Sequence, residues 1–269
     1  MEPRLDQELL QRLEKLQIIA HERTHNKVLQ LFQSFGGQGK VLEIPAGEGA
    51  LAWRLSQLGY EVTGGDVDPA FFKVPFLKCI YLDMNRTFPV EDGAFDYISC
   101  IEGIEHLENH FGFIRECHRV LRPNGRLILS TPNILNIASR LKYLLSGFYS
   151  LCPGPINEFS AVPVFDHINP LTYYQLRYML HTNGFRIERV CTDLYRRSCY
   201  GLIFLYPFVR LAMLRTMRKE TDAQQRLANR EIRKAMGSRD LFLGRTLIVS
   251  AVKQGKSEPV PTTLASDMS

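Results

Sequence analysis

The chain has 269 residues, of which 45% are hydrophobic and 23% charged, so it is long enough to bury one large core and has the charge content of an ordinary globular protein. Its formal net charge of +5 permits an acidic partner but is too mild to demand one. None of the six cysteines lies in a C-x-x-C pair, which excludes a zinc ribbon and a thioredoxin-type redox motif.

The first expected element is a helix over residues 3–35, because apolar side chains recur at three- and four-residue steps until two glycines interrupt them. The opening residues, MEPRLDQELLQRLEKL, contain acids and lack the apolar core of a secretory signal, so we expect a reducing, cytoplasmic environment. Residues 21–25, HERTH, match the H-E-x-x-H pattern of zinc proteases. No third ligand is evident, and we interpret His21 and His25 as a surface pair on one helix face.

Residues 38–132 alternate short apolar runs with amphipathic helices. Helices are expected at 50–60 and 110–121, and strands at 40–44, 61–66, 76–83, 95–101 and 126–132. This alternation, with short links, predicts parallel strands in a doubly wound α/β sheet. Right-handed crossovers place the carboxyl ends of such strands along one edge, where ligands bind.

After Pro132 two insertions interrupt the pattern. Residues 134–168 combine an apolar helix with a proline-containing loop at the position of a substrate lid. We expect its aromatic residues to pack within the lid, and the alternative is that they line an apolar acceptor pocket; they are Tyr143, Phe148, Tyr149 and Phe159. A helix at 171–185 and a strand at 186–194 precede the second insertion, residues 199–240, and a last strand is expected at 245–253. The predicted organisation is an N-terminal helical segment (1–37), one domain (38–253) and a disordered tail (254–269).

The loop after the first strand reads LEIPAGEG, residues 42–49. It lacks a complete G-x-G-x-x-G, and Pro45 stands where the first glycine of such a loop usually lies. Because proline fixes its own φ, close approach of the backbone to a ligand rests on Gly47 and Gly49. Glu43 and Glu48 would repel a phosphate, so the loop suits a ligand that carries a positive group.

Four stretches in chain order carry a resemblance to a known family. They are VLEIPAGEG, VTGGDVDP, LDMNRTFPVEDGAFDYISCIEGIEHL and VLRPNGRLILSTPN. Together they resemble the ordered motifs of class I S-adenosylmethionine-dependent methyltransferases, over roughly residues 38–195 plus the last strand. The resemblance implies a Rossmann-like, seven-stranded sheet with an antiparallel last strand, S-adenosyl-L-methionine as cofactor, and methyl transfer as the activity.

The resemblance also implies roles for the residues of the first loop. Glu43 matches the acid that lies near the cofactor's ammonium group. Gly47 and Gly49, with Ala46 beside them, match the turn over which the methionine and ribose portion lies.

Later strand ends match the rest of the cofactor site. Asp66, followed by Val67, matches the acid that accepts hydrogen bonds from the ribose hydroxyls. Asp83 matches the acid near the adenine amino group, with Met84 beside the ring, and Glu102 lies close to the sulfonium.

A second constellation concerns the chemistry. Methyl transfer to an alcohol or phenol needs a base or a metal that makes the acceptor nucleophilic. Residues 100–110, CIEGIEHLENH, contain Glu102, Glu105 and His106, and VFDHINP contains His167. This pattern resembles the ubiquinone-biosynthesis O-methyltransferases and also the small-RNA terminal 2′-O-methyltransferases, in which two Glu and two His bind a divalent metal. We expect His106, His167 and Glu102 to be catalytic and do not expect a metal.

The acceptor is expected to be a small-molecule, glycan or lipid-linked group that is methylated on oxygen. Residues 134–168 lack the basic, aromatic-interleaved surface that single-stranded RNA requires, so nucleic acid is not expected. The alternatives are a metal-dependent RNA terminal 2′-O-methyltransferase and a non-catalytic binding module that keeps the cofactor fold.

The second insertion contains a strongly apolar stretch, residues 200–214, that is too short to span a bilayer and is followed by many basic residues. It is interpreted as a lid or dimer helix. The alternative is peripheral contact of residues 200–240 with the inner face of an acidic membrane.

Overall fold

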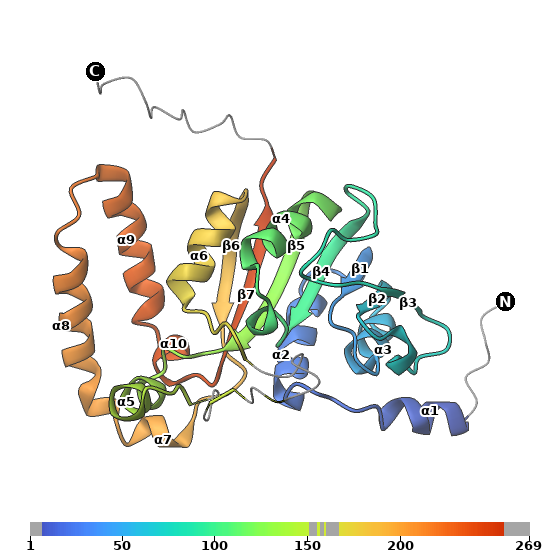
Figure 1. The fold of residues 1–269 in the computed structure, drawn as a ribbon, viewed down its shortest axis with the longest axis horizontal. Coiled ribbons are helices and arrows are strands. Elements are labelled where there is room, and N and C mark those ends of the chain that lie inside the picture. The colour runs from blue at the N-terminus through green and yellow to red at the C-terminus, as the bar shows by residue number, and fades with distance from the viewer. Residues whose placement is uncertain (1–6, 151–154, 157–158, 160–166, 256–269) are drawn as a thin grey trace.

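The computed structural model describes residues 7–150, 155–156, 159 and 167–255. Its centre is a seven-stranded sheet with the order β3-β2-β1-β4-β5-β7-β6 (Figure 1). The strands are β1 (Lys40–Glu43), β2 (Glu61–Asp66), β3 (Lys78–Tyr81), β4 (Phe95–Ile101), β5 (Leu121–Pro132), β6 (Phe185–Cys191) and β7 (Thr246–Lys253). Only β7 runs antiparallel to its neighbours, which confirms the predicted fold class.

Both faces of the sheet are covered, as the apolar strands require. Along β4, Ile98 and Cys100 join the core formed with helices α4 (His110–Val120) and α6 (Tyr173–Thr182). Tyr97 and Ile101 point to the other face, against α2 (Glu22–Gln33) and α3 (Ala50–Gln57). Successive side chains of a strand alternate between faces, so a strand buried on both sides is apolar along its whole length.

The single N-terminal helix expected over residues 3–35 is wrong. The structure has α1 (Gln7–Glu14) and α2, with a break between them. The two helices serve different surfaces, because Leu13 of α1 packs with Trp53 and Val74, whereas α2 packs on the sheet. The break is held by a tertiary contact, in which the Gln17 N–H donates to Glu48 Oε2 at 2.9 Å instead of continuing the helix.

The surface pair expected of His21 and His25 is also wrong. His21 is the N-cap of α2 and accepts a hydrogen bond from the Arg23 N–H through Nδ1 at 3.1 Å, so it does not share a helix face with His25. His25 is buried, and burial lowers its pKa to about 4, with Arg54 adding to the effect. His25 is therefore a core residue and not a surface one.

Element boundaries differ most at β3 and β5. β3 is shorter than predicted, and β5 begins directly after α4 instead of at residue 126. The pairing of Leu121 with Phe95 is followed by a register shift before Arg126 pairs with Tyr97. The R-P-N-G stretch expected to lie outside the sheet is thus an irregularity within β5, where Asn124 takes a left-handed φ of 62°.

The insertions add helices at the β6 end of the sheet (Figure 1). They are α5 (Ile137–Ser146), α7 (Arg197–Tyr200), α8 (Tyr206–Met217), α9 (Ala223–Met236) and α10 (Arg239–Leu243). Short 3₁₀ turns occur at η1 (Pro69–Phe71) and η2 (Ile104–His106), within the sheet region, and at η4 (Ile203–Leu205), before α8. Most of the lid loop and of the predicted disordered tail, residues 151–154, 157–158, 160–166 and 256–269, lies outside the described residues. Across the part of the chain that is described, no helix is long and apolar enough to cross a membrane.

Candidate active site at the carboxyl edge of the sheet

The loop between β1 and α3 is shaped by two left-handed glycines. Gly47 has φ 52° and Gly49 has φ 90°, and Gly49 is the N-cap residue of α3. The Gly47 N–H donates to Asp66 Oδ2 at 2.9 Å, and the Ala46 N–H donates to the Gly65 carbonyl at 3.0 Å. The loop is thereby fixed against the end of β2, and the start of α3 faces the same edge.

Gly49 predicts a large local effect of substitution. A Cβ at Gly49 would lie 2.6 Å from Phe72 Cε2 and 2.7 Å from Val74 Cγ2. Gly147, at the end of α5, has a comparable φ of 75° but open space around it. We expect Gly49→Ala to lower the free energy of unfolding by about 2–5 kcal/mol, from backbone strain plus overpacking, and Gly147→Ala by about 1–2 kcal/mol. Urea unfolding measures both, and equal losses would contradict the packing around Gly49.

An uncompensated acidic group lies beside this loop. Glu43, the last residue of β1, is 3% exposed, and its Oε2 has no hydrogen-bond partner among the described residues. Burial, and then the charge of Asp66, raises the pKa of Glu43 well above its ordinary value. Asp66 itself accepts from the N–H groups of Gly47 and Asp68. A buried carboxylate without a partner is costly, so this edge favours a cationic ligand.

Glu48 does not contribute to that excess, contrary to our interpretation of the sequence. The Gln17 N–H donates to its carboxylate, and Lys73 forms an ion pair with it. These contacts lower the pKa of Glu48. Its charge is therefore compensated within the protein, and the argument against a phosphate ligand rests on Glu43 and Asp66.

The predicted adenine end of the site lies after β3. Asp83 Oδ1 accepts from the Asn85 N–H at 2.8 Å, and Arg86 lies 3.6 Å from Asp83 Oδ2. This is an Asx turn, which leaves the side chain partly exposed. Met84 is half-buried, and Val67, after Asp66, is 44% exposed. The structure thus places all three predicted residues at the carboxyl edge, with open surface beside them.

Glu102 directly follows β4 and has a strained conformation. Its φ of 52° is left-handed, which is uncommon for a residue other than glycine and concentrates at functional sites. Its N–H donates to the Ser130 carbonyl at 3.1 Å and to Ser130 Oγ at 3.0 Å, and the Ser130 hydroxyl lies 3.3 Å from Glu102 Oε1. Burial raises the pKa of Glu102 to about 7, while Arg245 opposes the rise.

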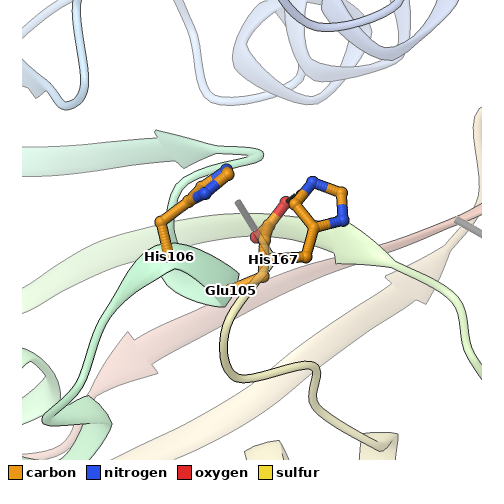
Figure 2. A group of neighbouring side chains, drawn as sticks. All are labelled: Glu105, His106 and His167. Carbon is orange, nitrogen blue, oxygen red and sulfur yellow. Dashed lines mark ion pairs between the residues drawn. The ribbon is translucent and has the colours of Figure 1, made fainter. Parts of the chain in front are cut away.

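The next turn brings three predicted residues together. Figure 2 shows Glu105 and His106 on the turn after β4, with His167 reaching them from the loop before α6. The His106 and His167 ring centroids lie 4.9 Å apart, and His167 Nε2 lies 3.9 Å from Glu105 Oε1. The Asn169 N–H fixes the two segments by donating to the Glu105 carbonyl at 3.0 Å.

Glu105 is the buried centre of this cluster. It is 0% exposed, and Thr131 lies beside its carboxylate without reaching ordinary hydrogen-bond geometry. Burial, and then the charge of Glu102, raises the pKa of Glu105 well above its ordinary value. The donor atoms of Glu105, His106 and His167 all lie within 4.8 Å of one another, so the group has the geometry for a metal ion. Glu102, the fourth residue of the pattern, is turned toward Ser130 and is not part of the group.

A network behind Glu102 was not foreseen. Arg245 Nε donates to Asp193 Oδ2 at 3.0 Å, Thr24 Oγ1 donates to the same oxygen at 3.0 Å, and Arg245 Nη2 lies 3.2 Å from Thr24 Oγ1. These residues come from α2 and from the segments flanking β6 and β7. No local pattern connects such distant positions, so the sequence offered no signal for this network.

The alternative that the aromatic residues of the lid line an acceptor pocket finds no support among the described residues. Tyr143 stacks on Tyr149 with centroids 4.5 Å apart, and Phe159 is 93% exposed. Phe148 is only partly buried. A large apolar cavity exists, but α6, α8 and α9 line it instead.

Comparisons with known proteins agree with this geometry. Residues 42–129 match the family described as "Methyltransferase domain". The ubiquinone biosynthesis O-methyltransferase of Xanthomonas oryzae pv. oryzae (strain PXO99A) is 36% identical over 103 residues, which cover 35% of this chain and 43% of the relative. The protein of the same name from Xanthomonas euvesicatoria pv. vesicatoria (strain 85-10) is 30% identical over 166 residues, covering 58% of this chain and 66% of the relative. The chain thus spans less than half of the first relative and just under two thirds of the second.

Solved structures resemble the chain over most of its length. A SAM-dependent methyltransferase from Archaeoglobus fulgidus superposes with a TM-score of 0.55 at 17% identity, covering 92% of this chain and 100% of that one. An S-adenosylmethionine-dependent methyltransferase from Mesorhizobium loti gives a TM-score of 0.51 at 15% identity, covering 86% and 98%. At these identities the likeness concerns the fold alone.

Proposed function

We propose that this chain, which carries a class I S-adenosylmethionine-dependent methyltransferase domain, transfers a methyl group from that cofactor to an oxygen atom of a small-molecule, glycan or lipid-linked acceptor. The observation that carries the proposal is Glu43, a buried carboxylate with an unpartnered oxygen in the described structure, beside Asp66 and two left-handed glycines. An ammonium and a sulfonium supply the positive charge that this edge lacks. The relatives' names support an oxygen acceptor.

The residues at the edge divide into binding and chemical roles. Asp66 accepts from the ribose hydroxyls, Glu43 faces the ammonium group, and Asp83 lies near the adenine. The bound cofactor supplies a methyl group already activated by the sulfonium charge. The chain then has to orient the acceptor, exclude water and remove a proton from the acceptor hydroxyl. His167 or His106 accepts that proton, and Glu105 Oε1, 3.9 Å from His167 Nε2, lies near enough to favour a positive charge on that ring.

Metal-assisted transfer is the second candidate, and the close donor group of Glu105, His106 and His167 favours it. One carboxylate and two imidazoles suit zinc or manganese, and such an ion would make an acceptor hydroxyl more acidic. The four-ligand arrangement of the RNA terminal enzymes is incomplete, because Glu102 bonds with Ser130. We therefore propose a histidine base without a metal.

A direct assay tests the function. The full chain is incubated with S-adenosylmethionine and separate panels of phenolic, glycan, lipid-linked and RNA acceptors, with and without EDTA, and formation of S-adenosylhomocysteine is followed. We expect EDTA-resistant turnover in a non-nucleic-acid panel and none with Asp66→Ala. EDTA-sensitive turnover on RNA would support the RNA enzyme instead. Cofactor binding without turnover in any panel would support the non-catalytic module.

Cofactor binding is expected to release protons. Burial raises the pKa of Glu43, so the ligand-free folded protein keeps a proton there at pH values where a free glutamate has lost it. The ionised form attracts the cationic cofactor, so affinity should increase as pH rises above the ordinary glutamate pKa and toward the raised pKa of Glu43. Calorimetry in two buffers of different ionisation enthalpy measures the protons released. Glu43→Gln should remove the release, and an equal release from that variant would contradict the role of Glu43.

We further propose that η4 and the outer face of α8 contact an anionic cytoplasmic leaflet. Phe204 and Phe208 are 63% and 67% exposed, and Ile203 and Leu211 are also exposed. Basic residues lie on the same or adjoining segments, namely Arg197, Arg210, Arg215, Arg218 and Lys219. Exposed apolar side chains flanked by cations are typical of interfacial membrane binding.

Liposome sedimentation tests this contact. Vesicles rich in phosphatidylserine should sediment the chain at low salt, and added salt should weaken the effect. Phe204→Ser with Phe208→Ser should reduce the bound fraction severalfold. Leu227→Ser on α9, where Leu227 is 61% exposed, is the matched control and should bind like the natural chain. Absence of the protein from the vesicle pellet at low salt would remove the proposal.

A further inference from the structure

A cavity of about 1090 Å³ is lined by residues of α6, α8 and α9. Figure 1 shows these three helices at the β6 end of the sheet. The walls of the cavity are mainly apolar and include four methionines from three helices, Met179, Met213, Met217 and Met236. This volume is at the upper end of the range of small-molecule sites. Methionine side chains are flexible and polarizable, and such walls adapt to elongated apolar ligands.

The cavity explains why the inner face of α8 is apolar. Val209, Met213 and Met217 recur at four-residue steps, so they share one helix face, and that face lines the cavity. The exposed Phe204 and Phe208 precede it on η4 and the outer face. Apolar side chains on two sides of a helix need an apolar surrounding on each of those sides. The inner face therefore has its own requirement, which is separate from the membrane contact proposed above.

One wall carries an uncompensated positive charge. Arg140 of α5 lines the cavity, and its Nε donates to the Leu135 carbonyl at 2.6 Å. Its Nη2 is buried without a hydrogen-bond partner, and no carboxylate of the described residues pairs with it. Arg177 of α6 is by contrast paired with Glu231 at 2.6 Å. Among the described residues that line the cavity, Glu108 is the one acid, and it is exposed.

The wall also adjoins the catalytic cluster. Asn169 and His110 both line the cavity. Asn169 donates through its N–H to the Glu105 carbonyl at 3.0 Å and through Nδ2 to the Leu107 carbonyl at 3.2 Å. His110 is the first residue of α4, shortly after η2, and its Nε2 is buried without a hydrogen-bond partner in the described structure. The cavity is thus a compartment next to the proposed base, lined by residues that are not part of the glycine loop.

We propose that this cavity binds an amphipathic molecule, whose long aliphatic body lies among the methionines and whose anionic headgroup is held by Arg140. A guanidinium in an apolar wall recognises a carboxylate or phosphate through charge-assisted hydrogen bonds. The binding itself does not depend on methyl transfer. That this molecule presents the acceptor atom to His167 rests on the function proposed above.

Fluorescence titration with cis-parinaric acid, a long-chain polyene fatty acid, tests the site in the full chain. We expect saturable binding that Arg140→Gln weakens roughly tenfold or more and Arg140→Lys largely restores. Ala212→Trp should block binding by filling the cavity. Competition by palmitate and by lysophosphatidate distinguishes a carboxylate from a phosphate headgroup, and hexadecanol should compete weakly.

Three controls separate this outcome from the others. Circular dichroism establishes that each variant is folded. Binding of S-adenosylmethionine by Ala212→Trp should be unchanged, because Ala212 lies outside the cofactor site. If the natural chain itself does not bind S-adenosylmethionine, that result counts against the proposed function and not against the cavity. Absence of saturable parinaric acid binding, or binding that is insensitive to both Arg140→Gln and Ala212→Trp, would overturn the inference.

Discussion

Asp66→Ala is expected to abolish measurable binding of S-adenosylmethionine. In the proposed site Asp66 accepts two charge-assisted hydrogen bonds from the ribose hydroxyls, each worth about 1.5–3 kcal/mol, so their loss should lower affinity by roughly 10²- to 10⁴-fold. The variant also loses the bonds that hold the loop, because Asp66 accepts from the Gly47 N–H at 2.9 Å and the Asp68 N–H at 3.0 Å. Isothermal calorimetry measures the affinity directly.

Two companion variants make the result specific. Asp68→Ala removes an exposed carboxylate two residues away, whose interaction is a cap on η1 through the Ala70 N–H at 3.2 Å, and it should bind the cofactor normally. Asp66→Asn keeps an oxygen acceptor for the Gly47 N–H but lacks the negative charge, so its affinity should be intermediate. If Asp66→Ala binds as tightly as Asp68→Ala, Asp66 does not hold the ribose.

His167→Ala is expected to lower turnover by roughly 10²- to 10⁴-fold, the contribution typical of a positioned base, while cofactor affinity stays unchanged. His167 lies on the loop before α6, its ring lies next to that of His106, and its Nε2 lies 3.9 Å from Glu105 Oε1. His181→Ala, on the exposed side of α6, is the matched control and should keep normal turnover.

The variants also separate a base from a metal ligand. If the histidine acts as a base, His167→Ala should lose turnover in the presence and absence of EDTA, and added zinc should not bind the natural chain more tightly than the variant. If His167 and His106 hold a metal, calorimetry should show zinc binding that either substitution removes. Full turnover of His167→Ala on the true acceptor would eliminate both roles.

The sheet could be predicted because its signals are local. β4 is buried along its length and mainly apolar because helices cover both of its faces. The crossovers then fix which edge carries Glu43, Asp66 and Glu102. The break between α1 and α2 could not be predicted, because Leu16, Ile19 and Ala20 continue the helical spacing. The competing contact is Gln17 with Glu48, which the periodicity does not report.

The role of a site residue could be predicted from the sequence only where its place at the end of a strand decides that role. Glu48 looked like a free acid beside the glycines, and its compensation by Lys73 depends on how η1 and the following loop fold back. The Arg245–Asp193 pair behind Glu102 joins segments from the far end of the chain. The apolar stretch at residues 200–214 was visible, but its pattern could not show that Met213 would face a cavity beside α6.

The central claim is that the carboxyl edge binds S-adenosylmethionine. Titration of the natural chain with S-adenosylmethionine in a calorimeter tests it most directly. The account predicts saturable binding of one cofactor per chain with release of protons. A folded chain that produces no binding heat at millimolar cofactor, in buffers of different ionisation enthalpy, would contradict it.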